Sequence, residues 1–204
     1  MKVTALKEKR KAITAVILDD GSELLLDSET VYIEKIKVGS EIENTEELIY
    51  KSDYKRAKSR ALWYLSRSSH SEKELYSKLL RGGFSETASR DAVERMKELA
   101  LINDEAYAAR LAEYYKGSGI SANESVQKML QKGINRELAK SFFEDEEDEI
   151  DKIKYLLEHK YSKKLGDEES VKKVFAALIR KGFSYRDVRD ALKSYSEEIL
   201  YSEE

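Results

Sequence analysis

The chain lacks cysteine and proline altogether and has only nine glycines among its 204 residues. Without cysteine it forms no disulfide, no thiolate metal site and no cysteine nucleophile. This absence is typical of a reducing compartment, so we expect a cytoplasmic protein. All-β sandwiches and barrels depend on proline and glycine to separate their strands, whereas long helices do not. The composition therefore favours a mainly α fold.

Long hydrophobic runs and histidine are also scarce. No stretch approaches the roughly 20 apolar residues that cross a bilayer, and the short apolar run at residues 12–18 leads directly into the acidic turn Asp19-Asp20-Gly21. We predict no signal peptide and no membrane partner. His70 and His159 are far apart and have no metal-ligand spacing. An enzyme would need convergent carboxylates that no pattern supports, so we expect no catalytic residue, no metal, no cofactor and no enzymatic activity.

Charge alternates along the chain although the net value is only −3. Residues 1–50 carry a net −4, residues 51–101 a net +5, residues 102–150 a net −5 and residues 151–204 a net +1. This pattern suits an elongated protein that contacts a partner with charge variation of its own. Solvated helix faces would give the same counts, so both interpretations stay open.

The first 44 residues differ from the rest. Residues 12–18 and 23–27 are apolar and partly β-branched, and they flank Asp20-Gly21, which predicts a hairpin. A third apolar stretch, residues 31–38, is either a strand or a helical turn. We predict a small β-rich module over residues 1–44.

From Thr45 onward the hydrophobic period is helical and the sequence repeats. Three similar turns contain Gly83, Gly133 and Gly182, which are 50 and 49 residues apart. A glycine in the left-handed conformation at each turn would end one helix just before the next begins. The predicted N-caps of the following helices are Ser85, Asn135 and Ser184.

Each turn lies within a unit of three amphipathic helices, and two units contain the capping boxes Ser71…Glu74 and Ser121…Glu124. We predict three-helix repeats at residues 45–101, 102–147 and 148–204, stacked into an elongated curved array. The acidic run 144–149 is interpreted as a solvated helix junction rather than a calcium site. The predicted buried faces of the first two repeats include these residues: Tyr54, Ala57, Ala61, Leu65, Leu99, Tyr107, Leu111 and Tyr114.

The candidate binding residues are cationic. Arg56, Lys58, Arg60 and Arg67 lie close in sequence to Tyr54, Trp63 and Tyr64, a mixture that can bind phosphates and stack on bases. However, the helical spacing of Trp63 suggests a core residue, and lysines and arginines normally coat exposed helix faces. Other candidates lie mostly near helix ends, where the helix dipole explains them equally well. These are Lys73, Arg81, Lys132, Arg136, Arg180 and Lys181.

Three segments together resemble one known family. Residues 60–67, which read RALWYLSR, are followed by SEKEL at 71–75; LINDEAYA occupies 101–108 and QKGI occupies 131–134. This combination is similar to the RecX family, bacterial regulators of the RecA recombinase, over roughly residues 55–190. One departure is Asn123-Glu124-Ser125, where the family often has arginine.

The resemblance implies that the protein binds in the helical groove of the RecA filament on single-stranded DNA and bridges neighbouring protomers. It would thereby damp ATP hydrolysis, strand exchange and the co-protease activity that triggers the SOS response in DNA repair and recombination. Single-stranded DNA is a second candidate partner, and we expect a monomer. The main alternative is a helical-repeat nucleic-acid-binding protein that acts independently of RecA, with residues 51–101 binding phosphates.

Overall fold

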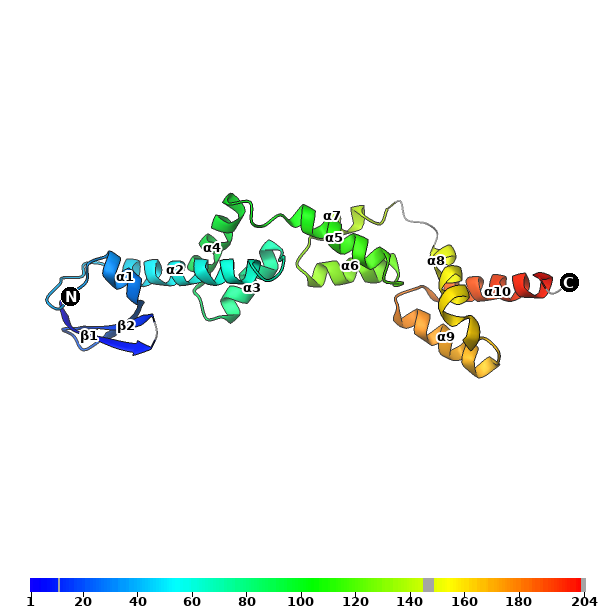
Figure 1. Cartoon of the computed structure of the whole chain (residues 1–204), viewed down its shortest axis with the longest axis horizontal. Coiled ribbons are helices and arrows are strands. Elements are labelled where there is room, and N and C mark those ends of the chain that lie inside the picture. Colours follow the sequence, from blue (N-terminus) through cyan, green and yellow to red (C-terminus); the bar gives the residue numbers. More distant parts are fainter. Residues whose placement is uncertain (11, 145–148, 203–204) are drawn as a thin grey trace. The chain divides into compact units, whose positions relative to one another are not determined.

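The computed structural model describes residues 1–10, 12–144 and 149–202 and divides the chain into two compact units, Met1–Asn103 and Asp104–Glu204. It is mainly helical with one small sheet at the N-terminus (Figure 1), as predicted. Each unit is considered separately below.

The first unit begins with a three-stranded antiparallel sheet in the order β1-β2-β3, formed by β1 (Val3–Arg10), β2 (Ile13–Leu18) and β3 (Glu23–Asp27). The predicted β2–β3 hairpin is confirmed, and Gly21 in its turn has a φ of 85°. Strand β1 is not among the strands predicted from the sequence. Its second half, Lys7–Arg10, is charged and lies at the sheet edge, so it lacks the apolar signal of a central strand.

The third apolar stretch, residues 31–38, begins in a short helix and continues outside regular structure; it is not a strand. Helix α1 (Ser28–Ile33) is capped by Asp27, whose side chain accepts a hydrogen bond from the Thr30 amide. The hydrophobic core of this module then combines sheet, α1 and the following helix: Val3, Val16, Leu18, Leu26, Val31, Ile42 and Leu48.

Helix α2 (Thr45–Leu65) joins this module to the first three-helix repeat. Leu48 and Ser52 in its first half are buried, and the Ser52 hydroxyl accepts a hydrogen bond from the Asp27 amide in β3. Ala57 and Ala61 in its second half are fully buried with the helices that follow. The predicted module boundary at residue 44 therefore comes just before a helix whose first half packs with the N-terminal module and whose second half packs with the first repeat.

The first repeat continues with α3 (Glu72–Arg81) and α4 (Glu86–Glu98). Ser71 caps α3 through the Glu74 amide, as predicted, and Gly83 has a φ of 83°. The core contains Ala57, Ala61, Leu75, Leu79, Phe84, Ala88, Ala92, Val93, Met96 and Ile102. Leu99 is 45% exposed, so its predicted burial is wrong; α4 ends at Glu98, and Leu99 lies beyond its last packed turn.

The second unit opens with α5 (Asp104–Lys116), α6 (Ala122–Gln131) and α7 (Arg136–Ser141). The caps Ser121 and Asn135 are confirmed, and Gly133 has a φ of 87°. Tyr114 is 69% exposed, which contradicts the prediction, because the buried face of α5 passes through Ala112 and Tyr115. The core of this repeat contains Ala108, Ala112, Tyr115, Val126, Met129, Ile134, Ala139 and Phe143.

The third repeat comprises α8 (Glu149–Leu156), a π-helical turn (Leu157–Tyr161), a 3-10 turn (Ser162–Lys164), α9 (Glu168–Arg180) and α10 (Tyr185–Ser202). Its core contains Ile153, Leu156, Leu157, Tyr161, Val174, Leu178, Phe183, Val188 and Ala191. Of the acidic run, residues 145–148 lie outside the described residues, so its interpretation as a solvated junction stays a prediction.

The second and third repeats meet at the last glycine turn. The Ser121 amide donates a hydrogen bond to the Lys181 carbonyl at 3.0 Å, and the Lys181 ammonium donates to the Gly119 carbonyl at 2.8 Å. Gly182 has a φ of 89°, and a Cβ there would lie 2.6 Å from the Glu124 Cβ. Backbone of the third repeat therefore approaches α6 closely. Each predicted module contains its own hydrophobic cluster; their independence as domains and their stacking into a curved array stay predictions.

Candidate interaction surface on helix α2

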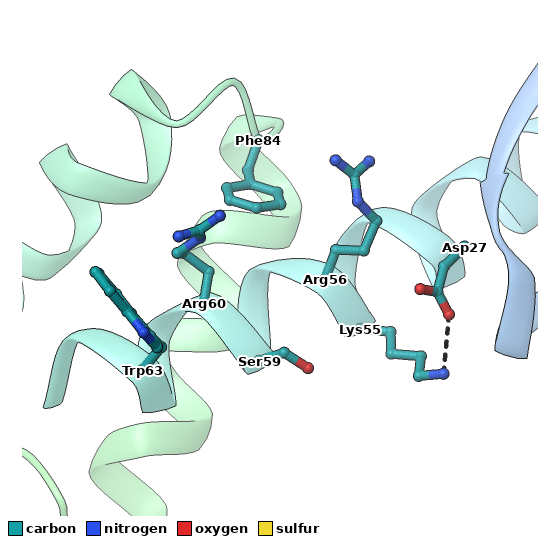
Figure 2. Close-up of a pocket in the computed structure, with 7 residues that line it drawn as sticks. All are labelled: Asp27, Lys55, Arg56, Ser59, Arg60, Trp63 and Phe84. Carbon is teal, nitrogen blue, oxygen red and sulfur yellow. Dashed lines mark hydrogen bonds and ion pairs between the residues drawn. The ribbon is translucent and has the colours of Figure 1, made fainter. Parts of the chain in front are cut away.

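One side of α2, together with the turn that follows it, carries three arginines and the only tryptophan of the chain. Arg56, Arg60, Trp63 and Arg67 follow at intervals of four, three and four residues, which places them on one face of a helix. We call these four residues the arginine face. Figure 2 shows Arg56 and Arg60 extending from the same side of α2. The buried side of the helix, by contrast, holds small residues such as Ala57 and Ala61, so α2 can pack closely on its repeat.

The cations on this part of α2 lie over aromatic rings. The Arg56 guanidinium carbon is 5.5 Å from the centre of the Phe84 ring, and those of Arg60 and Arg67 are 5.4 and 4.5 Å from Trp63. These are favourable cation–π distances, and they hold the guanidinium groups without neutralising them. Lys58 makes the same type of contact with Tyr54, at 5.7 Å.

Trp63 is 44% exposed, so the prediction that it lies in the core is wrong. Its ring contacts Tyr64 edge-on at 5.3 Å, and the two arginines partly cover it. Phe84, by comparison, is buried at the end of the glycine turn. The repeat therefore presents one large aromatic side chain to solvent beside two exposed guanidinium groups.

No carboxylate pairs with Arg56, Lys58, Arg60 or Arg67 among residues 1–10, 12–144 and 149–202. The first half of the same helix behaves differently. There, Lys51 is 3.1 Å from both Glu34 and Glu47, and Lys55 is 2.9 Å from Asp27. Positive charge is thus neutralised where α2 meets the sheet and remains available where it meets solvent.

A groove of about 400 Å³ follows this surface (Figure 2). Arg56, Ser59, Arg60 and Trp63 line it together with Phe84, and the ion pair of Lys55 with Asp27 closes one end. Guanidinium groups bind carboxylates and phosphates in a bidentate manner, and the indole can stack on a planar group. The groove is therefore suited to binding an anionic partner.

Two contacts fix α2 against α4. Asp53 accepts hydrogen bonds from the Ser85 amide at 2.8 Å and from its hydroxyl at 2.6 Å, at the start of α4. The Tyr50 hydroxyl donates to Asp91 at 2.5 Å. This hydrogen bond, followed by burial, raises the pKa of Tyr50 to about 12, so the phenol stays protonated at neutral pH. The arginine face thus belongs to a helix anchored at several points.

The end of α2 is supported by a buried histidine. His70 is 6% exposed, and its Nε2 is 3.1 Å from the Ser68 hydroxyl, while its Nδ1 is 3.3 Å from Glu74. Tyr64 contacts its ring edge-on. These partners satisfy the imidazole and connect the turn after Arg67 to α3, which gives His70 a structural role.

The remaining predicted residues lie on elements other than α2. Lys73 and Arg81 are exposed on α3, and Arg81 donates a hydrogen bond to the Ser77 carbonyl of its own helix. Lys132 is partly buried after α6, and Arg180 is exposed at the end of α9. The structure thus spreads these candidates over several helix ends.

Two predicted residues of the second unit have distinct surroundings. Arg136 lines a groove of about 350 Å³ with Asn123 and Lys140. Lys181 is instead engaged with Gly119 at the junction of the second and third repeats, where burial and, secondly, the ammonium of Lys160 lower its pKa. An internal hydrogen bond therefore already uses one of the predicted binding lysines.

Within the described part of the chain, no three His, Asp or Glu side chains are grouped so that they could hold a metal ion. The same residues include no helix that is long and apolar enough to cross a membrane. What α2 presents is a surface of charged and aromatic side chains.

Comparison with known proteins identifies the family. Residues 57–96 match the family described as "RecX, first three-helix domain". The chain is 30% identical over 193 residues to "Regulatory protein RecX" of Caldanaerobacter subterraneus subsp. tengcongensis, covering 92% of this chain and 95% of that protein. The chain belongs to the RecX family. "Regulatory protein RecX" of Streptococcus mutans serotype c is 29% identical, covering 100% of this chain and 83% of that protein.

Solved RecX structures show the same fold. One, described as "Crystal structure of regulatory protein RecX", has a TM-score of 0.58 at 21% identity and covers 93% of this chain and 98% of its own. RecX from Lactobacillus salivarius has the same TM-score at 23% identity and covers 71% of this chain and 97% of its own. The segment that matches the first RecX three-helix domain contains Arg60, Trp63 and Arg67, so most of the arginine face lies in it.

Proposed function

We propose that this chain binds the RecA filament on single-stranded DNA in the cytoplasm and restrains its ATP hydrolysis, strand exchange and co-protease activity. Membership of a family of regulatory proteins supports this proposal. The observation that carries it in the structure is the arginine face of α2, whose cations have aromatic partners and no carboxylate partner among the residues that the structure describes. The protein would act by binding, as a monomer and without a cofactor.

The two halves of the arginine face would contribute differently. Arg60 and Arg67 are exposed and can reach a partner, whereas Arg56 is partly buried against Phe84. Lys58 is also partly buried; it lies over the Tyr54 ring and does not belong to the arginine face. Exposed charges mainly steer association and set register, so their removal should weaken binding without unfolding the repeat. Reversal of Arg56 or Lys58 would also disturb packing, which makes Arg60 and Arg67 the cleaner test.

The test is the ATPase activity of RecA on single-stranded DNA, titrated with wild type and with Arg60→Glu/Arg67→Glu. We expect wild type to inhibit and the variant to need about tenfold more protein for half-inhibition, which corresponds to about 1.4 kcal/mol of binding free energy. The control is Arg95→Glu/Lys97→Glu, which reverses two exposed cations of the same unit that already pair with Glu98 and Glu72, so that the net charge changes by the same amount.

Three outcomes separate the possibilities. If saturating wild type leaves the ATPase unchanged, regulation of RecA is rejected. If the α2 variant inhibits as well as wild type, the arginine face is not the surface that binds RecA. If the control reduces inhibition as much as the α2 variant does, only net charge matters and the surface has no specific role.

Exposed Trp63 favours a second candidate function, direct binding of single-stranded nucleic acid without RecA. Because Trp63 is the only tryptophan, a base that stacks on it should quench the protein's intrinsic fluorescence. Quenching by an oligonucleotide that weakens steeply with salt would support this alternative. Unchanged fluorescence at a saturating oligonucleotide concentration would exclude stacking on Trp63.

A further inference from the structure

A second cationic and aromatic surface lies in the third repeat. Over residues 152–164 the chain has five lysines and one glutamate. Three of the lysines, Lys160, Lys163 and Lys164, are exposed, and they form no ion pair with any residue that the structure describes. Lys172 and Lys173 in the same repeat instead pair with Glu168 and Glu169, at 2.6 and 2.7 Å. Unpaired charge is thus concentrated in one segment.

An exposed aromatic pair lies in this segment. Tyr155 is 61% exposed, and the imidazole of His159 stacks on its ring at 4.1 Å with an angle of 22° between the planes. The His159 Nδ1 is 3.0 Å from the Tyr155 carbonyl, which holds the imidazole in place. An exposed ring that already stacks on a planar group has the geometry to stack on a nucleobase as well.

The aromatic pair and the lysines are neighbours in sequence. Tyr155 and His159 are four residues apart and their rings stack, while Leu156, Leu157 and Tyr161 are buried. The exposed Lys160 follows His159 directly, and Lys163 and Lys164 lie in the 3-10 turn that comes next. The π-helical turn at Leu157–Tyr161 interrupts the regular helix here, and such turns are frequent at functional sites. Burial lowers the pKa of Lys181 and repulsion from the Lys160 ammonium lowers it further, so Lys160 lies near the junction with the second repeat.

We propose that Tyr155, His159, Lys160, Lys163 and Lys164 form a binding site for single-stranded nucleic acid. The lysines would contact consecutive phosphates, and the ring of Tyr155 would stack on an unpaired base. Double-stranded nucleic acid offers the same phosphates, but its bases are stacked on one another and not available to Tyr155. This site is separate from the arginine face and does not depend on the action on RecA.

The test measures binding of a fluorescent thymidine 30-mer to the full chain without RecA, by anisotropy, over a series of salt concentrations. For single-stranded DNA, each phosphate that a cation neutralises adds about 0.7 to the slope of log K against log salt. We therefore expect Lys163→Gln/Lys164→Gln to reduce the slope by about 1.4, because two such cations are removed. The control Lys172→Gln/Lys173→Gln also removes two adjacent exposed lysines from the same repeat and should leave the slope unchanged.

Stacking is tested separately with Tyr155→Ala, which we expect to weaken binding about tenfold with little change in slope, and with Tyr155→Phe, which should retain affinity. The proposal is overturned if both lysine pairs reduce the slope equally, since net charge alone would then explain binding. It is also overturned if Tyr155→Ala binds like wild type. Because RecA is absent, these results are independent of the ATPase experiment, and Arg60→Glu/Arg67→Glu should retain the Lys163/Lys164 effect.

Discussion

The three glycine turns allow a matched experiment on how the repeats are joined. Gly83 and Gly182 have nearly the same φ, 83° and 89°, but different surroundings. A Cβ at Gly83 would meet no atom within 4 Å, whereas one at Gly182 would lie 2.5 Å from the Ser121 hydroxyl and 2.6 Å from the Glu124 Cβ. Alanine at Gly83 thus tests backbone strain alone, and alanine at Gly182 tests strain together with the contact between repeats.

The two costs can be estimated from these surroundings. An L-residue in the left-handed region costs about 1–2 kcal/mol, which is the expected destabilisation for Gly83→Ala. Overpacking in a close contact adds about 1–3 kcal/mol, so Gly182→Ala should cost about 2–5 kcal/mol. Gly166 provides the control, because its φ lies outside the left-handed region and a Cβ there would meet nothing within 4 Å. Gly166→Ala should leave stability nearly unchanged.

Urea unfolding followed by two probes distinguishes the units. Trp63 lies in the first unit, so its fluorescence reports on that unit, while circular dichroism reports on helices in both. We expect Gly83→Ala to lower the urea midpoint measured by Trp63 fluorescence. Gly182→Ala should instead lower the urea midpoint of the second unit, which circular dichroism detects and Trp63 fluorescence does not. Equal destabilisation by the two variants would show that the approach of Gly182 to α6 contributes nothing to stability, and our reasoning would be refuted.

Two further predictions concern the contacts that anchor α2. Asp53→Ala should reduce the free energy of unfolding by about 1 kcal/mol, because the Ser85 amide and hydroxyl lose their acceptor, and the urea midpoint measured by Trp63 fluorescence should fall accordingly. Asp53→Asn keeps one acceptor oxygen and should have a smaller effect. Asp91→Asn should lower the pKa of Tyr50 from about 12 toward about 10, measured by NMR of labelled tyrosine with Tyr50→Phe for assignment. Because the pKa of Tyr50 is raised in the folded state, its hydrogen bond to Asp91 should stabilise the fold fully below about pH 10 and lose this effect as the pH rises to about 12. If the pKa of Tyr50 is unchanged in Asp91→Asn, the hydrogen bond to Asp91 is not the cause of the raised pKa.

Local signals with a strict physical requirement predicted the structure best. The three turn glycines have the positive φ that ends one helix immediately before another, and Ser85, Asn135 and Ser184 follow as N-caps. Few residue types satisfy either requirement, so their recurrence about every fifty residues identified the repeat. β1 has no such requirement. An edge strand pairs on one side only and tolerates charged residues, so its sequence resembles that of a loop.

Trp63 shows why the candidate site was only partly predicted. A tryptophan at helical spacing is typical of a core residue, and this pattern suggested a core position. The spacing of its neighbours contains the contrary information: Ala57 and Ala61, four residues apart, define the buried side of α2, and Trp63 is two residues from Ala61, about 200° around the helix. The same geometry places Arg56, Arg60 and Arg67 beside Trp63. The exposure of this tryptophan beside the arginines supports our proposal that the arginine face contacts a partner.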